Sequence, residues 1–168
     1  MFTQLTTKTL TNNKTMEEKL TIKHLAPYLP YGLKAKNTDS SNEEGKEWMG
    51  IKTIIGMHDE TVMQSLNNFP YIIRFHVSKI KPILRPLSDL TKEIEVNGER
   101  FVPIIHLKKL FNLRMYQFMD NKIYSLNYGV FIDYTQLPYN VIQKLIEWHF
   151  NVFNLPENLY VDINTLKQ

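Results

Sequence analysis

The sequence of 168 residues has no cysteine, which excludes disulfide bonds, thiolate metal sites and cysteine nucleophiles. No apolar run approaches the roughly 20 residues that a membrane helix needs. The formal net charge of +3 is too small by itself to indicate a nucleic-acid-binding protein. Residues 1–15 lack the apolar core of a secretory signal and the arginine-rich pattern of a transit peptide. Together with the missing cysteines, this predicts a cytoplasmic protein without a membrane partner.

Glycine is also scarce, with six residues, and neither GxGxxG nor GK[ST] occurs. Nucleotide-dependent enzymes that hold phosphates on such loops are therefore not expected. The sequence has no GxSxG elbow and no HExxH motif, and its five histidines are far apart. The cluster His58-Asp59-Glu60 is interpreted as an exposed turn. His149 is interpreted as a hydrogen-bonded histidine at the core edge, and Asp133 and Asp162 as capping or tethering carboxylates. We accordingly expect no catalytic residue, cofactor or metal.

The rest of the composition is that of one ordinary globular domain, with 43% hydrophobic and 22% charged residues. We expect a flexible tail over residues 1–15 and a single domain over residues 16–168. Thr15 with Glu18 fits an early helix cap. Residues 37–47 carry no apolar side chain, which predicts an exposed loop.

Strand and helix signals come in runs rather than in alternation. Thr21 is placed to cap a short helix through Leu25, and proline at 27 and 30 prevents a long one. Strands are expected over 33–36, 50–57, 61–66, 70–80, 123–126, 130–134 and 158–166, and helical segments over 87–90, 104–113 and 138–150. This order predicts an α+β fold: an antiparallel curled sheet or small barrel over about residues 33–102, with a helical and hairpin part packed against it.

The segment 93–102 carries the most specific local pattern. Asn97-Gly98 suits a type I′ turn, because both positions need a positive φ. The turn sets Val96 opposite Glu99, Glu95 opposite Arg100 and Ile94 opposite Phe101. One face of the predicted hairpin is then apolar and the other carries a charge pair.

Basic residues near aromatic residues suggest contact with nucleic acid. The cations in question are Arg74, Lys79, Lys81, Lys108, Lys109 and Arg114, with Tyr71, Phe75 and Phe111 close by in sequence. Many domains hold single strands on a sheet face of this kind. The aromatic pattern of RNA-binding sheets is absent, and a solvated strand face explains the same residues.

Docking on another protein meets fewer obstacles. Tyr28 and Tyr31 lie in a proline-stiffened segment where complete burial would be costly, and tyrosine is favoured at interface centres. We therefore predict a partner-binding surface formed by Tyr28, Tyr31, Lys79, Lys81 and Arg85. The alternative is that these rings pack on the body of the protein.

Three stretches resemble a family of proteins without assigned activity from Bacteroidetes phages and prophages. They are LAPYLPYGLK (25–34), KPILRPLSDLTKEIEVNGE (81–99) and the segment 137–166, and together they cover less than half of the chain. Asn154 stands where that family usually has glycine, and Pro156-Glu157-Asn158 replaces a turn richer in glycine. The family resemblance implies an origin in a mobile element but no catalytic residues.

From these observations we expect a non-enzymatic phage or prophage protein. It would dock on a host protein or ribonucleoprotein and inhibit or modulate it. By analogy with anti-CRISPR inhibitors, a CRISPR effector nuclease is a plausible target; this rests on gene context, not on side chains. The alternative is a nucleic-acid-binding module in phage DNA or RNA handling. The sequence predicts no oligomeric state.

Overall fold

A short helical segment opens the part of the chain that the computed structural model describes, namely residues 19–38, 50–65, 72–111, 113–114, 116–119 and 122–166. Helix α1 (Ile22–Leu25) begins after Thr21, as predicted, with a reciprocal cap between Thr21 and His24. The two prolines then convert the chain to the 3-10 helix η1 (Ala26–Tyr31). Gly32 ends η1 at φ 70°, a left-handed conformation that favours glycine. The predicted tail and the early cap at Thr15 lie outside the described residues.

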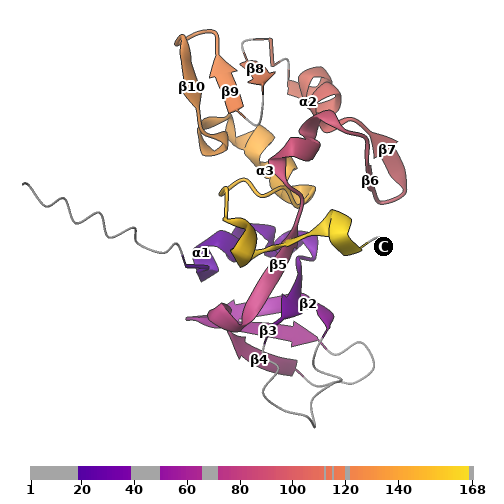
Figure 1. Cartoon of the computed structure of the whole chain (residues 1–168), viewed down its shortest axis with the longest axis vertical. Coiled ribbons are helices and arrows are strands. Elements are labelled where there is room, and N and C mark those ends of the chain that lie inside the picture. Colours follow the sequence, from indigo (N-terminus) through magenta and orange to yellow (C-terminus); the bar gives the residue numbers. More distant parts are fainter. Residues whose placement is uncertain are drawn as a thin grey trace, which may run out of the picture.

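The chain then forms a curled, open sheet in the order β11-β5-β1-β2-β3-β4. All its pairings are antiparallel except that of β11 with β5. In Figure 1, the β2–β4 part of this sheet lies below α1, and β5 runs upward from it. Its strands are β1 (Lys34–Asn37), β2 (Ile51–His58), β3 (Thr61–Ser65), β4 (Ile72–His76), β5 (Ile80–Leu84) and β11 (Val161–Asp162). Most of the predicted loop 37–47 lies outside the described residues.

The strand predicted over 70–80 is in fact two strands separated by one 3-10 turn, η3 (Val77–Lys79). The Val77 amide donates to the carbonyl of Glu60 at 2.7 Å, and the His76 ring accepts from the Ser78 amide at 3.2 Å. These bonds stop the ladder of β4 and turn the chain toward β1, where β5 pairs. Continuous β-branched residues predicted an extended chain correctly but could not show this bend.

The hairpin around Asn97-Gly98 is confirmed in every predicted pairing. Strands β6 (Ile94–Val96) and β7 (Glu99–Phe101) follow the 3-10 helix η4 (Leu87–Thr91), and the Glu95 and Arg100 side chains lie 3.2 Å apart. The hairpin does not belong to the large sheet, however, and forms a two-stranded sheet of its own. The extension of the predicted curled sheet to residue 102 is therefore wrong.

The helices α2 and α3 and the strands β8, β9 and β10 build the upper part of the molecule (Figure 1). A small sheet in the order β10-β9-β8 contains the strands predicted over 123–126 and 130–134, which are β9 and β10, and one unpredicted strand, β8. The last predicted strand is reduced to the two residues of β11 between 3-10 turns. The bounds are α2 (Pro103–Phe111), β8 (Tyr116–Met119), β9 (Lys122–Ser125), β10 (Val130–Ile132), η5 (Tyr134–Gln136), α3 (Tyr139–Glu147), η6 (Glu157–Leu159) and η7 (Ile163–Leu166).

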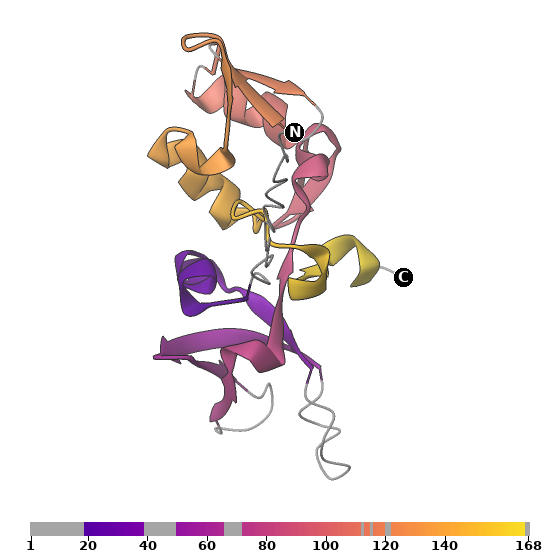
Figure 2. The ribbon, with the colours of Figure 1, turned by 60° about the vertical axis from the view of Figure 1, so that its left-hand side comes forward.

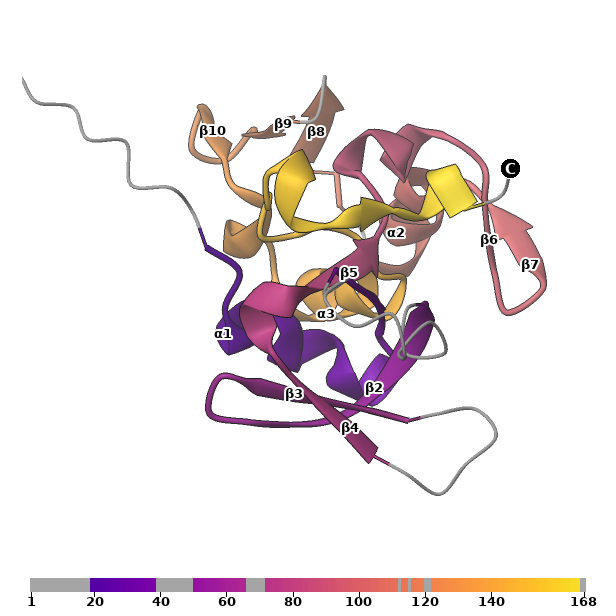
Figure 3. The ribbon, with the colours of Figure 1, turned by 60° about the horizontal axis from the view of Figure 1, so that its bottom comes forward.

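Helix α3 ends at Glu147, earlier than the predicted Phe150. His149 takes a left-handed φ of 60°, and Phe150 then bridges to Arg85 in parallel. Figures 1 and 2 place α1 and α3 between the large and small sheets. Figure 3 shows the C-terminal segment crossing beside β5.

One buried cluster joins both parts of the fold. It includes Ile54 and Val62 of the large sheet, Leu107 of α2, and Val141 and Leu145 of α3. The predicted α+β class is confirmed, with open rather than closed sheets. No helix within the described residues is long and apolar enough to cross a membrane.

Candidate functional site

The structure removes Tyr28 from the predicted partner-binding surface. Its side chain is completely buried, and its hydroxyl donates to the carbonyl of Phe150 at 2.6 Å and accepts from the amide of Val152 at 3.3 Å. Burial raises the pKa of Tyr28 well above its usual range. The expected penalty for burying this phenol does not arise, because both roles of the hydroxyl are satisfied.

Arg85 is also buried rather than exposed, so its predicted role as a surface contact is wrong. Its side chain is 6% exposed, and Nη2 donates to the carbonyl of Glu95 at 2.9 Å. Tyr31 and Arg85 do line one common pocket, but Lys79 and Lys81 lie at the η3–β5 bend and do not line it. The five predicted residues therefore do not form a single surface.

The predicted nucleic-acid contacts divide into two groups. Arg74, Lys79 and Lys81 lie on β4, η3 and β5, in the large sheet and its bend. The other three cations lie at the opposite end, around α2 and β8 (Figure 1). These three line one open pocket of about 790 Å³, here called the basic pocket, whose lining residues are Lys108, Lys109, Leu113, Arg114, Tyr116, Gln117 and Leu126.

The basic pocket has a one-sided charge. Lys108, Lys109 and Arg114 are all exposed, and none forms an ion pair with another residue in the described part of the chain. No aspartate or glutamate is among its described lining residues. Such a pocket attracts anions, and the adjacent Tyr116 ring adds an apolar wall.

The small sheet next to the basic pocket exposes an aromatic face. Gln117, Tyr124 and Phe131 occupy one row across β8, β9 and β10. Lys122 lies two residues before Tyr124 and so shares its side of the sheet. We call Gln117, Lys122, Tyr124 and Phe131 the sheet face. Gln117 belongs to both the sheet face and the basic pocket, so the two surfaces are continuous.

Contacts within the sheet face hold its rings in position. The rings of Tyr124 and Phe131 meet edge to face with centroids 5.3 Å apart, and the Lys122 ammonium lies 5.7 Å from the Phe131 centroid. Phe131 is 57% exposed, whereas Ile123 and Ser125 on the other side of β9 are buried. The exposed aromatic area is therefore on the outer side of the sheet.

The sheet face leads at its other side to a second open pocket of about 620 Å³. Lys122 and Phe131 line it together with Asp133, Tyr134 and Phe153. Burial raises the pKa of Tyr134 to about 12, so this phenol stays neutral near pH 7. The surface from the basic pocket to this second pocket thus alternates cations, rings and polar groups.

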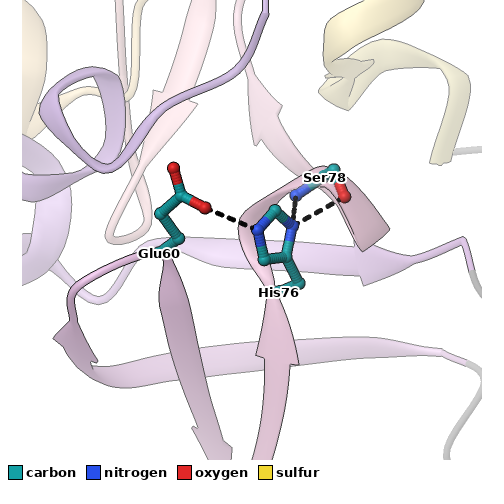
Figure 4. Close-up of polar contacts among 3 residues, drawn as sticks. All are labelled: Glu60, His76 and Ser78. Carbon is teal, nitrogen blue, oxygen red and sulfur yellow. Dashed lines mark hydrogen bonds and ion pairs between the residues drawn. The ribbon is translucent and has the colours of Figure 1, made fainter.

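A separate cluster has the residue types of a hydrolase triad (Figure 4). The Ser78 hydroxyl lies 2.7 Å from Nδ1 of His76, and Nε2 of His76 lies 2.8 Å from a Glu60 carboxylate oxygen. This order of nucleophile, base and carboxylate was not predicted, because Ser78 does not lie in a GxSxG elbow.

Its surroundings favour a structural role for this cluster. The His76 side chain is 51% exposed and that of Glu60 78%, and none of the three residues lines a pocket described above or below. Nδ1 of His76 also accepts from the Ser78 backbone amide, which caps η3. The cluster therefore links the β2–β3 turn, through Glu60, to the bend between β4 and β5, through His76 and Ser78.

The other carboxylates and histidines singled out in the sequence have local roles. Asp162 accepts from the Asn164 amide at 2.9 Å, and Asp133 caps η5 with Gln136, as predicted. His58 and Asp59 form an exposed turn pair, also as predicted. Within the described ranges, no group of three His, Asp or Glu side chains is placed to hold a metal ion.

Sequence reasoning missed the sheet face because it did not recognise β8. Tyr116 and Phe118 alternate with Gln117, which was a usable strand signal. Lys122 and Phe131 lie on β9 and β10, and the pairing of these two neighbouring strands brings them together. No protein-family model, curated protein or solved structure matches this chain. The function proposed below is therefore argued from the geometry of these surfaces.

Proposed function

We propose that this protein binds single-stranded nucleic acid, free or exposed in a ribonucleoprotein, on the basic pocket and the sheet face, without catalysing a reaction. The observation that supports this most strongly is the gathering of Lys108, Lys109 and Arg114 around a pocket whose described lining has no carboxylate. The exposed rings that continue from this pocket supply the second element that such binding needs.

The two surfaces match the two parts of a nucleotide. Ammonium and guanidinium groups neutralise phosphates and release counterions, which provides affinity independent of sequence. Exposed aromatic rings stack on bases, which a single strand leaves free and a duplex does not. The sheet face offers Phe131 for stacking, and Lys122 beside it can meet a neighbouring phosphate. The arrangement therefore favours a single strand over a duplex.

The resemblance to phage and prophage proteins suggests a biological setting for this binding. A host ribonucleoprotein, such as a CRISPR effector, presents single-stranded nucleic acid in the cytoplasm. Within our proposal, the protein would inhibit or modulate such a particle by occupying that strand. This finer part of the proposal rests on that resemblance and on analogy alone.

The first test measures affinity as a function of salt. Affinity is measured by fluorescence anisotropy with labelled RNA and DNA single strands of about 16 nucleotides. This length is sufficient, because a single OB-fold domain contacts about 4–16 nucleotides of a single strand. Between about 50 and 200 mM salt, we expect the affinity to fall steeply. In the triple variant K108Q/K109Q/R114Q, the slope of log K against log salt should be smaller by about 2, since each phosphate contact contributes about 0.7.

A matched triple variant separates the location from the net charge. K19Q/K23Q/K36Q removes the same charge from three exposed lysines outside the basic pocket. We expect it to retain nearly the original slope. No binding at 50 mM salt, or an equal loss in both triple variants, would contradict the proposal.

A second arm tests stacking on the sheet face. Phe131→Ala should weaken binding by about 1–3 kcal/mol, the usual contribution of one stacked base. Tyr139→Ala is the control, since Tyr139 is 77% exposed but lies on α3. Equal affinities of the two variants would show that the sheet face does not contact bases.

A further inference from the structure

A third pocket, distinct from the basic pocket, lies where the two parts of the fold meet. It has a volume of about 720 Å³ and draws its walls from η1, β1, β5, the β6–β7 hairpin, the end of α3 and η7. We call it the junction pocket. Its charged or titratable lining residues are Lys34, Arg85, Glu95, Glu147 and His149.

Arg85 is a buried cation without a carboxylate partner. Among the described residues, no carboxylate lies within 4.0 Å of its guanidinium, and its Nε has no hydrogen-bond partner. Burial lowers the pKa of Arg85, and the more distant charges of Asp89 and Asp162 oppose this only in part. Asp89 is itself held by Lys92 at 2.8 Å and Asn164 at 2.6 Å. A buried charge in this situation is unfavourable unless an anion compensates it.

His149 lies next to Arg85 and is also incompletely satisfied. The Arg85 amide donates to the His149 carbonyl at 2.7 Å, which fixes the two residues side by side. Nε2 of His149 is buried and has no partner in the described part of the chain. The residue holds a left-handed φ of 60°, an unfavourable conformation that is found preferentially at functional sites. Burial, followed by the charge of Arg85, lowers the pKa of His149, so the ring is neutral near pH 7.

The acidic residues of the junction pocket are already paired. Glu95 lies 3.2 Å from Arg100, and Glu147 lies 2.8 Å from Lys144. Lys34 is exposed and makes no ion pair with a residue that the structure describes. Two cations, Lys34 and Arg85, therefore remain uncompensated at one pocket. Their combined charge matches a dianion.

We infer that the junction pocket binds a small phosphate monoester, with the phosphate against Arg85 and Lys34 and the organic group against Pro30, Tyr31 and Val96. A phosphate monoester carries about 1.5 to 2 negative charges near pH 7. The pocket volume is within the range of about 300–1,000 Å³ typical of small-molecule sites, so there is room for more than the anion. This inference does not depend on nucleic-acid binding at the sheet face.

The neighbouring histidine contributes a second polar contact. With a dianion close by, protonation of His149 becomes more favourable, and Nε2 can then donate to a phosphate oxygen. The buried nitrogen that has no protein partner would thereby acquire one. The ligand would also connect β1, β5 and the β6–β7 hairpin, so it should stabilise the whole fold.

The test uses phenyl phosphate, inorganic phosphate and succinate as probes in isothermal titration calorimetry and thermal unfolding. We expect phenyl phosphate to bind and to raise the Tm, and inorganic phosphate to compete with it. Lys34→Gln should weaken phenyl phosphate binding about tenfold, in the range of a lost charge-assisted hydrogen bond. Lys36→Gln should leave binding unchanged, because Lys36 is exposed on the same strand but does not line the pocket.

Two further variants keep the result interpretable. Arg85→Gln can unfold the protein, so Arg85→Lys is measured as a second variant. It keeps the positive charge but loses the planar set of guanidinium N–H donors. K108Q/K109Q/R114Q should bind phenyl phosphate normally, since the basic pocket is a different site. No binding of any probe, equal binding by the Lys34→Gln and Lys36→Gln variants, binding lost in the basic-pocket triple, or a preference for succinate would each overturn the inference.

Discussion

Tyr28 is a structural residue of the core and not a surface contact, because its hydroxyl group finds hydrogen-bond partners inside the fold. A tyrosine between prolines at 27 and 30 has the properties of an interface contact. In the folded chain its ring is buried, because the backbone at Phe150 and Val152, more than 120 residues away, offers both an acceptor and a donor. No local pattern around residue 28 contains that information.

Removing this hydroxyl should therefore reduce stability and leave binding intact. Tyr28→Phe is expected to lower the free energy of unfolding by about 1–3 kcal/mol, because it leaves buried backbone groups without a partner. Tyr31→Phe is the control, since its hydroxyl accepts from Gln143 at the surface, at 3.2 Å. Urea unfolding measures both. An equal, small effect of the two substitutions would contradict the structural role of Tyr28.

At the scale of elements, the most accurate predictions concern segments whose own residues determine the conformation. The β6–β7 hairpin has every predicted pairing, because Asn97 and Gly98 both adopt the positive φ that its turn requires. Strand β4 and helix α3 end earlier than predicted. In both cases backbone hydrogen bonds to another segment lie where the element ends. After β4, the Val77 amide donates to the Glu60 carbonyl; after α3, His149 and Asn151 bond to the backbone of Arg85.

The hairpin turn can be tested through its glycine. Gly98 has φ 85°, so Gly98→Ala should destabilise the protein by about 1–2 kcal/mol, the usual cost of a left-handed residue with a Cβ. Gly50→Ala is the control, because Gly50 does not have a positive φ and an added Cβ would meet open space. Thermal unfolding of both variants provides the measurement. A neutral Gly98→Ala would show that the turn does not hold this conformation in solution.

On the scale of the whole molecule, the arrangement of the large sheet, α3 and the small sheet depends on one shared core. Residues from both ends of the described chain, such as Leu20 and Leu155, belong to the same buried cluster. The same arrangement separates the predicted cations into two groups and creates the junction pocket from six elements. Both candidate surfaces are therefore products of the tertiary structure.

Cooperation between the two parts can be measured directly. Leu107 in α2 is completely buried, and Leu107→Ala should lower the free energy of unfolding by about 2–5 kcal/mol. Because the core is shared, native-state hydrogen exchange should show equal losses of protection for Val62 in the large sheet and Leu145 in α3. Leu110→Ala, at a position 50% exposed on the same helix, should have a much smaller effect. Unchanged protection at Val62 would indicate two independently unfolding parts.

The sequence by itself determined the α+β class, the Thr21 cap, the β6–β7 and β9–β10 hairpins and the approximate position of α3. These depend on backbone preferences and on the spacing of apolar residues over a few positions. Only the tertiary structure decided that Tyr28 and Arg85 are buried, and that Leu126 in the β9–β10 turn joins Lys108, Lys109 and Arg114 in one pocket. Such contacts join residues that are distant in the chain, and they depend on how whole elements pack against each other.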